Sequence, residues 1–315
     1  MFFSIIICTY NPDLRLLKRT MNSIVRLVIP DLCQVERIIV DNNSTNNFND
    51  KIEIKNLLSK FKLIKETQQG LSNARIKGVG NANGDVILFV DDDNELTEDY
   101  LIGLKYLFER HQQVVIWGPS IINIDFIDGA EDWVIKYMMP MFQYKQDQQT
   151  KFGSEKGWPN YYPVGSGLVI KKYAFELYQK QYKQGKLTIT GRKGEDLSSG
   201  EDSQIIWTII KNDMCVGTSN LLSLNHIITK RRTSLEYIVK LNFNIAYSFY
   251  KAQYEIFSNK SSLNLSPTYF TKMKLFVKTL VKCKFNIVTS VKVYKVENAW
   301  YIGYMKFYHE FNKLG

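Results

Sequence analysis

The stretch DVILFVDDDNE, residues 85–95, decides the fold class. Five apolar residues form a continuous run of strand length, and three consecutive aspartates follow at once. A strand without polar alternation is typical of a parallel sheet that is covered on both faces. Ligands of such sheets bind beyond the carboxyl ends of the strands, so the aspartates stand where a site is expected.

The flanking sequence alternates between strand-like and helix-like segments. Apolar runs of strand length occupy residues 2–10, 35–44, 61–66 and 112–119. Apolar residues at helical spacing, or small residues ending at a glycine, occupy residues 13–28, 70–84 and 98–111. This order predicts an α/β fold, with a Rossmann-like, mostly parallel sheet flanked by helices.

Polar residues follow three of the predicted strands at the point where each strand ends. Cys8-Thr9-Tyr10-Asn11 ends the first, Val40-Asp41-Asn42-Asn43 the second, and Asp91-Asp92-Asp93 the run described above. One such end is unremarkable, because Asp and Asn favour turns. Three ends at one sheet edge indicate a binding site.

Three adjacent carboxylates repel one another, and the end of a buried strand partly desolvates them. A divalent cation such as Mg²⁺ or Mn²⁺ compensates this charge, and both prefer carboxylate oxygens together with substrate phosphates. In an extended backbone Asp91 and Asp93 point one way and Asp92 the other. A solvated acidic turn is the equally weighted alternative. A calcium loop is disfavoured, because Leu96 stands where its sharp turn needs glycine.

Composition excludes several classes of protein. The 315 residues are 45% hydrophobic and 23% charged, and no run reaches the roughly 18 apolar residues of a spanning helix. The N-terminus lacks the basic region of a secretory signal and reads as a buried strand. Four widely spaced cysteines form no metal-ligand or CxxC pattern, so we expect free thiols in a reducing cytoplasm.

The net charge of +10 is concentrated in one region. Residues 230–315 contain 15 Lys/Arg against 4 Glu and no Asp, whereas residues 1–229 contain 26 Lys/Arg against 27 Asp/Glu. This break predicts two functional regions, residues 1–229 and a basic, mainly helical region over residues 230–315.

Five segments in order resemble the family 2 glycosyltransferases of the GT-A fold: SIIICTYNP, IIVDNNST, GLSNARIKG, GDVILFVDDDNE and GED. The resemblance covers roughly residues 3–210 and departs from the family pattern at Ile76, where the family commonly has Asn. It implies a nucleotide-sugar donor and a divalent metal, Mn²⁺ or Mg²⁺. It also implies a GT-A catalytic domain over residues 1–229, with a nucleotide-sugar half of about residues 1–118 and an acceptor half of about residues 119–229. By the same resemblance, Asp93 would bind the metal, and Asp91 and Asp92 would contact the ribose or the metal shell. Thr9, Tyr10 and Asp41 would contact the nucleoside. Arg75 would lie near the nucleotide.

Gly-Glu-Asp occurs twice, at residues 194–196 and 200–202. LSSG follows the first copy, without apolar periodicity, and reads as a loop. SQIIWTIIKND follows the second, with isoleucines on one helix face, so Asp202 stands at a helix start that stabilises a carboxylate. The family motif also opens a helix. We therefore predict Asp202 as the general base and Glu201 as its positioning partner, although an Asp at a helix start can also be only a cap.

The histidines and the tail leave alternatives open. His226 follows Asp202 by 24 residues and is a tentative third metal ligand by resemblance, or else a structural histidine. His111 and His309 read as helix surface. The tail interleaves lysines with apolar residues, which fits attachment to an anionic membrane, a basic helical cap or a dimer surface. Nucleic-acid binding lacks any motif to support it.

Together these features predict a cytoplasmic, metal-dependent, inverting glycosyltransferase that modifies a glycan or lipid-linked acceptor, as in bacterial surface polysaccharide synthesis. A sugar-phosphate nucleotidyltransferase is the enzymatic alternative. It is disfavoured because CTYNPDLR lacks the glycine-rich loop that such enzymes need after the first strand. A nucleotide- or glycan-binding module without turnover is the third hypothesis.

Overall fold

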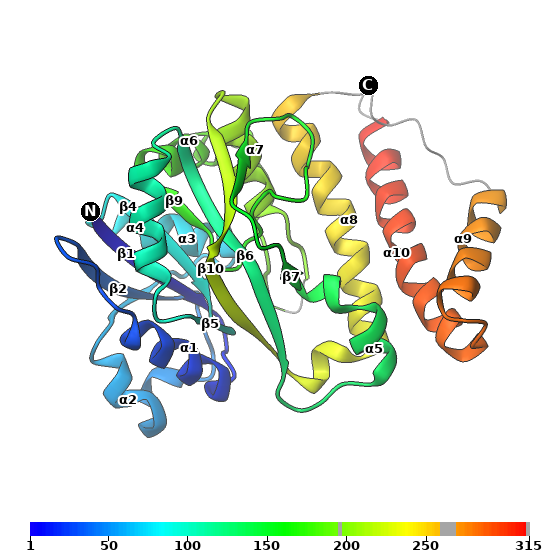
Figure 1. Ribbon diagram of the computed structural model, residues 1–315, viewed down its shortest axis with the longest axis horizontal. Coiled ribbons are helices and arrows are strands. Elements are labelled where there is room, and N and C mark those ends of the chain that lie inside the picture. Colours follow the sequence, from blue (N-terminus) through cyan, green and yellow to red (C-terminus); the bar gives the residue numbers. More distant parts are fainter. Residues whose placement is uncertain (195–196, 259–268, 313–315) are drawn as a thin grey trace.

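The computed structural model describes residues 1–194, 197–258 and 269–312. The first Gly-Glu-Asp copy therefore lies outside the described residues at Glu195 and Asp196. Strands and helices alternate through the first half of the chain, and helices alone make up its end (Figure 1). The strands are β1(Phe2–Thr9), β2(Gln34–Asp41), β3(Lys62–Lys65), β4(Val86–Asp91), β5(Asn94–Leu96), β6(Val114–Phe126), β7(Lys145–Gln146), β8(Lys151–Gly153), β9(Val169–Lys171) and β10(Cys215–Ile228). The helices are α1(Leu14–Arg26), α2(Ile52–Leu58), α3(Leu71–Gly80), α4(Tyr100–Arg110), α5(Asp132–Tyr137), α6(Lys172–Lys183), α7(Glu201–Lys211), α8(Leu235–Phe257), α9(Tyr269–Lys282) and α10(Ile287–Asn312).

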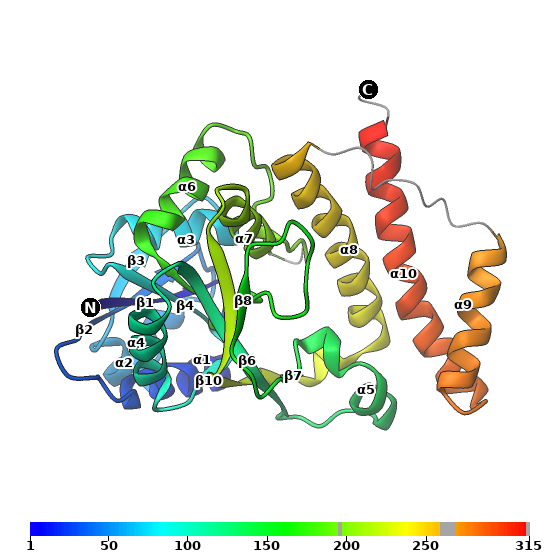
Figure 2. The ribbon, with the colours of Figure 1, turned by 45° about the horizontal axis from the view of Figure 1, so that its top comes forward.

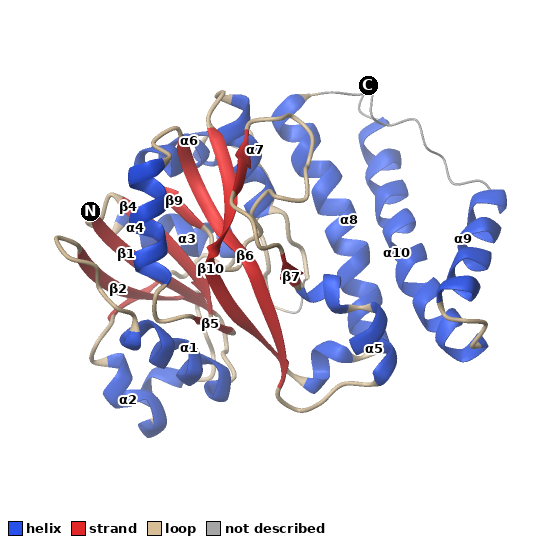
Figure 3. Cartoon of the chain, viewed as in Figure 1, coloured by secondary structure: helices blue, strands red, loops and turns tan. Residues whose placement is uncertain are grey.

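The strands form one sheet in the order β3-β2-β1-β4-β9-β6-β10-β5, with β7 and β8 added beside β6 and β10. The long ladders are parallel: β1 pairs β2 and β4, β2 pairs β3, and β6 pairs β10. The short strands β5, β7, β8 and β9 pair antiparallel. The sheet is thus mixed, because β9 lies between β4 and β6 and pairs antiparallel with both. Figure 3 distinguishes the strands of the sheet from the helices around it.

Alternate residues of β1 enter two separate cores. Phe3, Ile5 and Ile7 pack with apolar residues of α1 and α4 on one face. Ile6 packs with residues of α3, α6 and α7 on the other face. Both faces of the sheet are therefore covered, as the unalternating strands predict. The α/β fold class with flanking helices is confirmed.

Local elements match the sequence pattern closely, with shifts at their ends. Helix α1 begins after Asp13, whose side chain accepts the Arg15 N–H. The small-residue helix α3 ends at Gly80 rather than at Gly84, whose N–H donates to the Ser4 hydroxyl of β1. His111 is not helix surface. It follows α4, and its ring packs on Trp117 and Phe152 at 5.7 and 4.9 Å.

The basic end of the chain is helical, as predicted. Helix α10 packs along α8, where the Asn242 side chain donates to the Val296 carbonyl at 2.7 Å and Gly303 lies against the Phe243 carbonyl. Helix α9 is the outermost element, with α10 between it and α8 in both views (Figures 1 and 2). His309 lies exposed on α10, as predicted.

Helix α8 also contacts the sheet domain through its last turns. Glu255 accepts hydrogen bonds from the backbone N–H and hydroxyl of Thr188, and from the Gln204 side chain on α7. This contact fixes the first turn of α7, because Gln204 lies one turn after the helix begins. None of the helices in the part of the chain that the structure describes is both long and apolar enough to span a bilayer.

Candidate active site

A cavity of about 730 Å³ lies at the carboxyl ends of β1 and β4. It collects all but one of the residues that the sequence singled out, from elements far apart in the chain. These are Thr9, Tyr10, Arg75, Asp91, Asp92, Asp93, Glu201, Asp202 and His226. The exception is Asp41 at the end of β2, which is in register with Thr9 and whose carboxylate accepts the Ser44 N–H at 2.8 Å. Its neighbour Asn42 lines the cavity instead.

The three aspartates have three different partners. Asp91 lies 3.8 Å from the Arg75 guanidinium and accepts a long hydrogen bond of 3.4 Å from Ser166. Asp92 accepts the Thr9 hydroxyl. Burial and the adjacent Asp93 carboxylate raise the pKa of Asp92 to about 7, against the lowering effect of Thr9. The two aspartates that were expected to face one ligand therefore share no partner here.

Asp93 is buried and has a guanidinium as its counter-charge. Arg232, which follows β10, donates to its Oδ2 atom, and His226 Nε2 lies 3.4 Å from the same oxygen. Burial opposes the charge of Asp93, but His226 and Arg232 outweigh it and hold the pKa of this carboxyl well below its usual range. The buried carboxylate is thus ionised and balanced by the basic C-terminal region.

The orientation of His226 is set by its other ring nitrogen. Nδ1 is 2.8 Å from the Phe142 carbonyl oxygen, which can only accept, so Nδ1 carries the proton. Nε2 lies 3.2 Å from Arg232 Nη2 and 3.4 Å from Asp93 Oδ2, so it accepts from the guanidinium when the ring is neutral and donates to the carboxylate when the ring is protonated. Metal-ligating histidines are held in the same way, with the second nitrogen donating to a carbonyl or carboxylate.

The donor atoms at this point fit a divalent cation. Asp93 Oδ2 and His226 Nε2 converge on one place, and a positive charge already balances them there. Within the described ranges, no group of three or more His, Cys, Asp or Glu residues is arranged to hold a metal. Two protein ligands are enough for Mg²⁺ or Mn²⁺ when diphosphate oxygens supply the rest.

Arg75 connects the acid cluster to α7. Its side chain is only 2% exposed, lies 5.1 Å from the centre of the Phe89 ring, and pairs with Glu201 at 3.4 Å as well as with Asp91. Burial, more than the nearby Asp202 charge, raises the pKa of Glu201 to about 7, although Arg75 opposes this. Arg75 therefore holds acidic groups from two elements together.

Asp202 stands in the first turn of α7, as the sequence predicts. Gly200 precedes the helix as its cap residue at φ 112°, a conformation that glycine adopts without strain. Asp202 Oδ1 accepts the Ser203 N–H at 2.7 Å. Its Oδ2 lies beside Gly165, where a Cβ atom would come within 3.2 Å of that oxygen. One carboxylate oxygen is thus anchored while the other lies at the glycine wall of the cavity.

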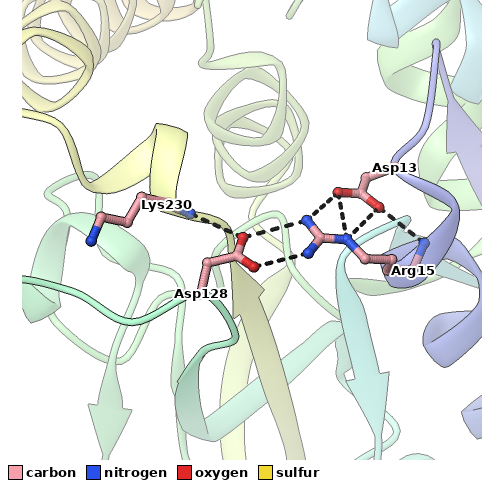
Figure 4. A network of polar contacts seen from close by, with 4 residues as sticks. All are labelled: Asp13, Arg15, Asp128 and Lys230. Atoms are coloured by element: carbon pink, nitrogen blue, oxygen red, sulfur yellow. Dashed lines mark hydrogen bonds and ion pairs between the residues drawn. The ribbon is translucent and has the colours of Figure 1, made fainter.

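A polar network joins three segments at the rim of the cavity (Figure 4). Arg15 pairs with Asp13 at 2.7 Å and with Asp128 at 2.8 Å, and Asp128 accepts the Lys230 backbone N–H at 3.3 Å. These side chains are largely exposed, so the pairs contribute little stability individually. They tie the loop after β1 to the turn after β6 and to the start of the basic region.

A comparison with protein families shows which family the chain belongs to. The family described as glycosyl transferase family 2 matches residues 4–176, which is more than half of the chain. The chain belongs to glycosyl transferase family 2. Its family segment contains Thr9, Arg75 and the three aspartates, whereas Asp202, His226 and Arg232 lie beyond the matched residues.

Relatives of this family 2 chain include an inactive polypeptide N-acetylgalactosaminyltransferase-like protein 5 from Macaca fascicularis. It is 28% identical over 159 residues, which cover 46% of this chain and 35% of the relative. The chain spans about a third of the length of the first curated relatives that it matches. The similarity is therefore confined to part of each relative.

Solved structures share the fold of the chain. GalNAc-T7 crystallised with UDP, GalNAc and Mn²⁺ is 15% identical with a TM-score of 0.53, and the match covers 86% of this chain and 53% of that one. TarS residues 1–349 from S. aureus with UDP-GlcNAc is 15% identical with a TM-score of 0.50, covering 99% and 92%. The GT-A expectation is confirmed at the level of the fold.

The sequence did not point to Arg232, which supplies the counter-charge of Asp93. The signal was present, because KRR follows His226 within six residues. It also missed Asn42, whose side chain accepts the Gly70 N–H at 2.7 Å and donates to the Gln68 carbonyl at 2.9 Å. Arg192, Lys193 and Arg231 add further positive charge to the cavity wall.

Proposed function

We propose that this chain is an inverting glycosyltransferase that moves a sugar from a nucleotide-diphosphate sugar to a glycan or lipid-linked acceptor. One observation carries the proposal. A carboxylate at the start of α7, Asp202, lines the same cavity as the Asp91–Asp93 cluster at the end of β4. This arrangement supports a donor site and a proton acceptor that share one space.

Asp202 is suited to the role of general base. It lies in the first turn of α7, where the Ser203 N–H anchors one of its oxygens. In a single displacement, the acceptor oxygen bonds to the anomeric carbon as the bond from that carbon to the diphosphate oxygen breaks. The hydroxyl proton passes to the Asp202 carboxylate, and the configuration at the anomeric carbon is inverted.

The leaving diphosphate needs positive charge around it. A bound Mg²⁺ or Mn²⁺, held by Asp93 and His226 with Asp91 in the surrounding shell, would neutralise that charge. Arg192, Lys193 and Arg231 line the cavity and are placed to contact the phosphates. We assign Thr9, Tyr10 and Asp92, which line the cavity, to the nucleoside. Asp41 would join them once its carboxylate leaves Ser44.

We propose a UDP-sugar as the donor and a surface glycan as the acceptor. Two neighbours with the same fold were crystallised with UDP and with UDP-GlcNAc, which makes UDP-sugars the first donors to test. Gly165 lines the cavity beside Asp202 and adds no side chain between that carboxylate and the acceptor. We assign the acceptor to bacterial surface glycans and the protein to the cytoplasm, where its four free cysteines fit a reducing compartment.

We also propose that three regions of the chain contribute different parts of the site. Residues 1–118 supply Thr9 and the aspartates, and residues 119–229 supply Asp202 and His226. Residues 230–315 supply Arg232, so the basic region takes part in the site and does not only cover it.

Replacing Asp202 with Asn tests the proposal. Asn keeps the size of the side chain but cannot take the acceptor proton, so transfer should fall by about 10²–10⁴-fold. Binding of UDP-sugar with Mn²⁺, measured by calorimetry, should survive because its contacts lie on other elements. Asp196→Asn, in the other Gly-Glu-Asp copy, is the matched control and should transfer sugar at close to the unmodified rate. A dead Asp196→Asn enzyme beside an active Asp202→Asn enzyme would reverse the assignment.

A further inference from the structure

The turn between α9 and α10 presents a patch of exposed apolar side chains. The α9 patch comprises Met273, Val277, Val281, Phe285, Ile287 and Val288. These side chains are 50–71% exposed, the highest value belonging to Phe285. Isolated apolar residues are common on protein surfaces, but a contiguous group of six on one hairpin indicates a binding surface.

Three residues of the patch form one face of an amphipathic helix, and the other three lie in the turn that follows it and in the first turn of α10. Met273, Val277 and Val281 recur at every fourth residue and lie on one side of α9. Leu275, Thr279 and Cys283 recur in the same way and are buried. The buried side faces α10, as the contact between Phe276 and Tyr294 and the 2.8 Å ion pair between Lys282 and Glu297 show. The exposed side therefore points away from the rest of the protein.

The charge around the patch has one sign. The 41 residues between Glu255 and Glu297 contain eight lysines and neither Asp nor Glu. Lys272, Lys278 and Lys284 are exposed beside the apolar side chains. An apolar stripe bordered by lysines complements the interface of a membrane whose headgroups are anionic.

We propose that the α9 patch attaches the protein to the surface of an anionic lipid bilayer. The apolar side chains enter the boundary between headgroups and acyl chains, and the lysines contact lipid phosphates. A second copy of the chain is a poorer occupant, because two such surfaces would bring lysines together without carboxylates to pair them. The attachment is independent of the proposed transferase activity, since the patch shares no residue with the cavity.

Point substitutions in the whole protein test this better than removing the tail, because α10 packs on α8. Val277→Ser, Val281→Ser and Val288→Ser, combined, remove apolar surface at positions that are more than half exposed, so folding should be retained. Leu32→Ser, Ile52→Ser and Ile102→Ser are the matched control on other exposed surfaces. Lys272→Gln, Lys278→Gln and Lys284→Gln remove charge, with Lys55→Gln, Lys60→Gln and Lys77→Gln as their control.

Flotation with vesicles of phosphatidylcholine, alone or with about one third phosphatidylglycerol, measures the binding. The unmodified protein should float with the anionic vesicles and much less with the neutral ones. The valine variant should bind them at least about tenfold more weakly, and the lysine variant should lose its preference for anionic lipid. Both control variants should bind like the unmodified protein.

Three results would overturn the proposal. The first is that the unmodified protein does not float with anionic vesicles. The second is that the control variants lose as much binding as the patch variants. The third is that light scattering shows a dimer that the valine variant converts to a monomer, because a second copy would then cover the patch.

Discussion

Replacing Arg232 with Gln is expected to destabilise the protein by leaving a buried carboxylate without its cation. Arg232 donates to Asp93, and the two side chains are only 12% and 11% exposed. Removing one partner of a buried ion pair costs about 3–5 kcal/mol, since the remaining charge stays desolvated. The loss should be near the lower end of this range, because His226 and Asn94 still contact Asp93.

The free energy converts into a melting temperature. The unfolding entropy is about 2.1 cal/mol/K per residue. If all 315 residues unfold together, a loss of about 3 kcal/mol lowers the melting temperature by about 5 °C. Mn²⁺ should recover part of this loss, because a divalent cation restores the missing positive charge on Asp93. It should raise the melting temperature of the variant more than that of the unmodified protein, where Arg232 competes for the same oxygen.

Thermal melts with and without Mn²⁺ measure both effects, and calorimetry gives the Mn²⁺ affinity directly. Arg231→Gln is the matched control, since Arg231 is exposed and lies one residue away. Its substitution should change stability by no more than about 0.5 kcal/mol. Equal Mn²⁺ shifts in Arg232→Gln and the unmodified protein would refute the reasoning, because Arg232 would then not occupy the place of the metal.

Three further predictions concern the rest of the cavity. Asp93→Ala should remove the Mn²⁺-dependent part of UDP affinity in calorimetry, and unchanged affinity would mean that the acid cluster is not the metal site. In the Glu201→Gln variant, the free energy of unfolding should rise relative to that of the unmodified protein by on the order of 1–3 kcal/mol between pH 5 and pH 8. Burial raises the pKa of Glu201 from 4.5 to about 7, so folding costs more once this group ionises in the unmodified protein; a pH-independent difference in melting temperature would contradict this. Gly165→Ala places a Cβ atom 3.2 Å from Asp202 and 3.5 Å from Arg75, so transfer should slow by at least about tenfold with melting little changed. Normal turnover would show that Asp202 does not act from this position.

The first half of the fold was predictable because its signals are local. The apolar run before Asp91 and the helical spacing from Leu14 onward depend on a few consecutive residues. Strand β9 was not assignable in the same way. Its three residues pair antiparallel with both β4 and β6. Long-range packing, rather than the sequence of β9 itself, determines this pairing.

The site was predictable where side chains follow the ends of strands, and unpredictable where partners are distant in sequence. Asp93 and Arg232 are 139 residues apart, so no local pattern joins them. Arg75 was expected near the nucleotide because of its motif. It lines the cavity from α3, and its buried guanidinium lies between acidic groups of β4 and α7, which its motif did not indicate.

These partners make the three aspartates unequal, although the sequence presents them as a uniform run. Asp91 is tied through Arg75 to Glu201 in the first turn of α7, so a change at Asp91 alters the charge beside the proposed base as well as the donor site. Asp93 is tied to Arg232, so a change there reaches the basic C-terminal region instead. Asp92 is held by Thr9 at the end of β1, and this pairing involves neither α7 nor Arg232.

Asp91→Asn should therefore lower both donor affinity and the rate of transfer at saturating donor, whereas Asp93→Asn should act mainly on Mn²⁺-dependent donor affinity. Steady-state kinetics with a UDP-sugar, read as separate changes in kcat and KM, distinguish the two, and identical profiles would show that Arg75 does not couple the acid cluster to α7.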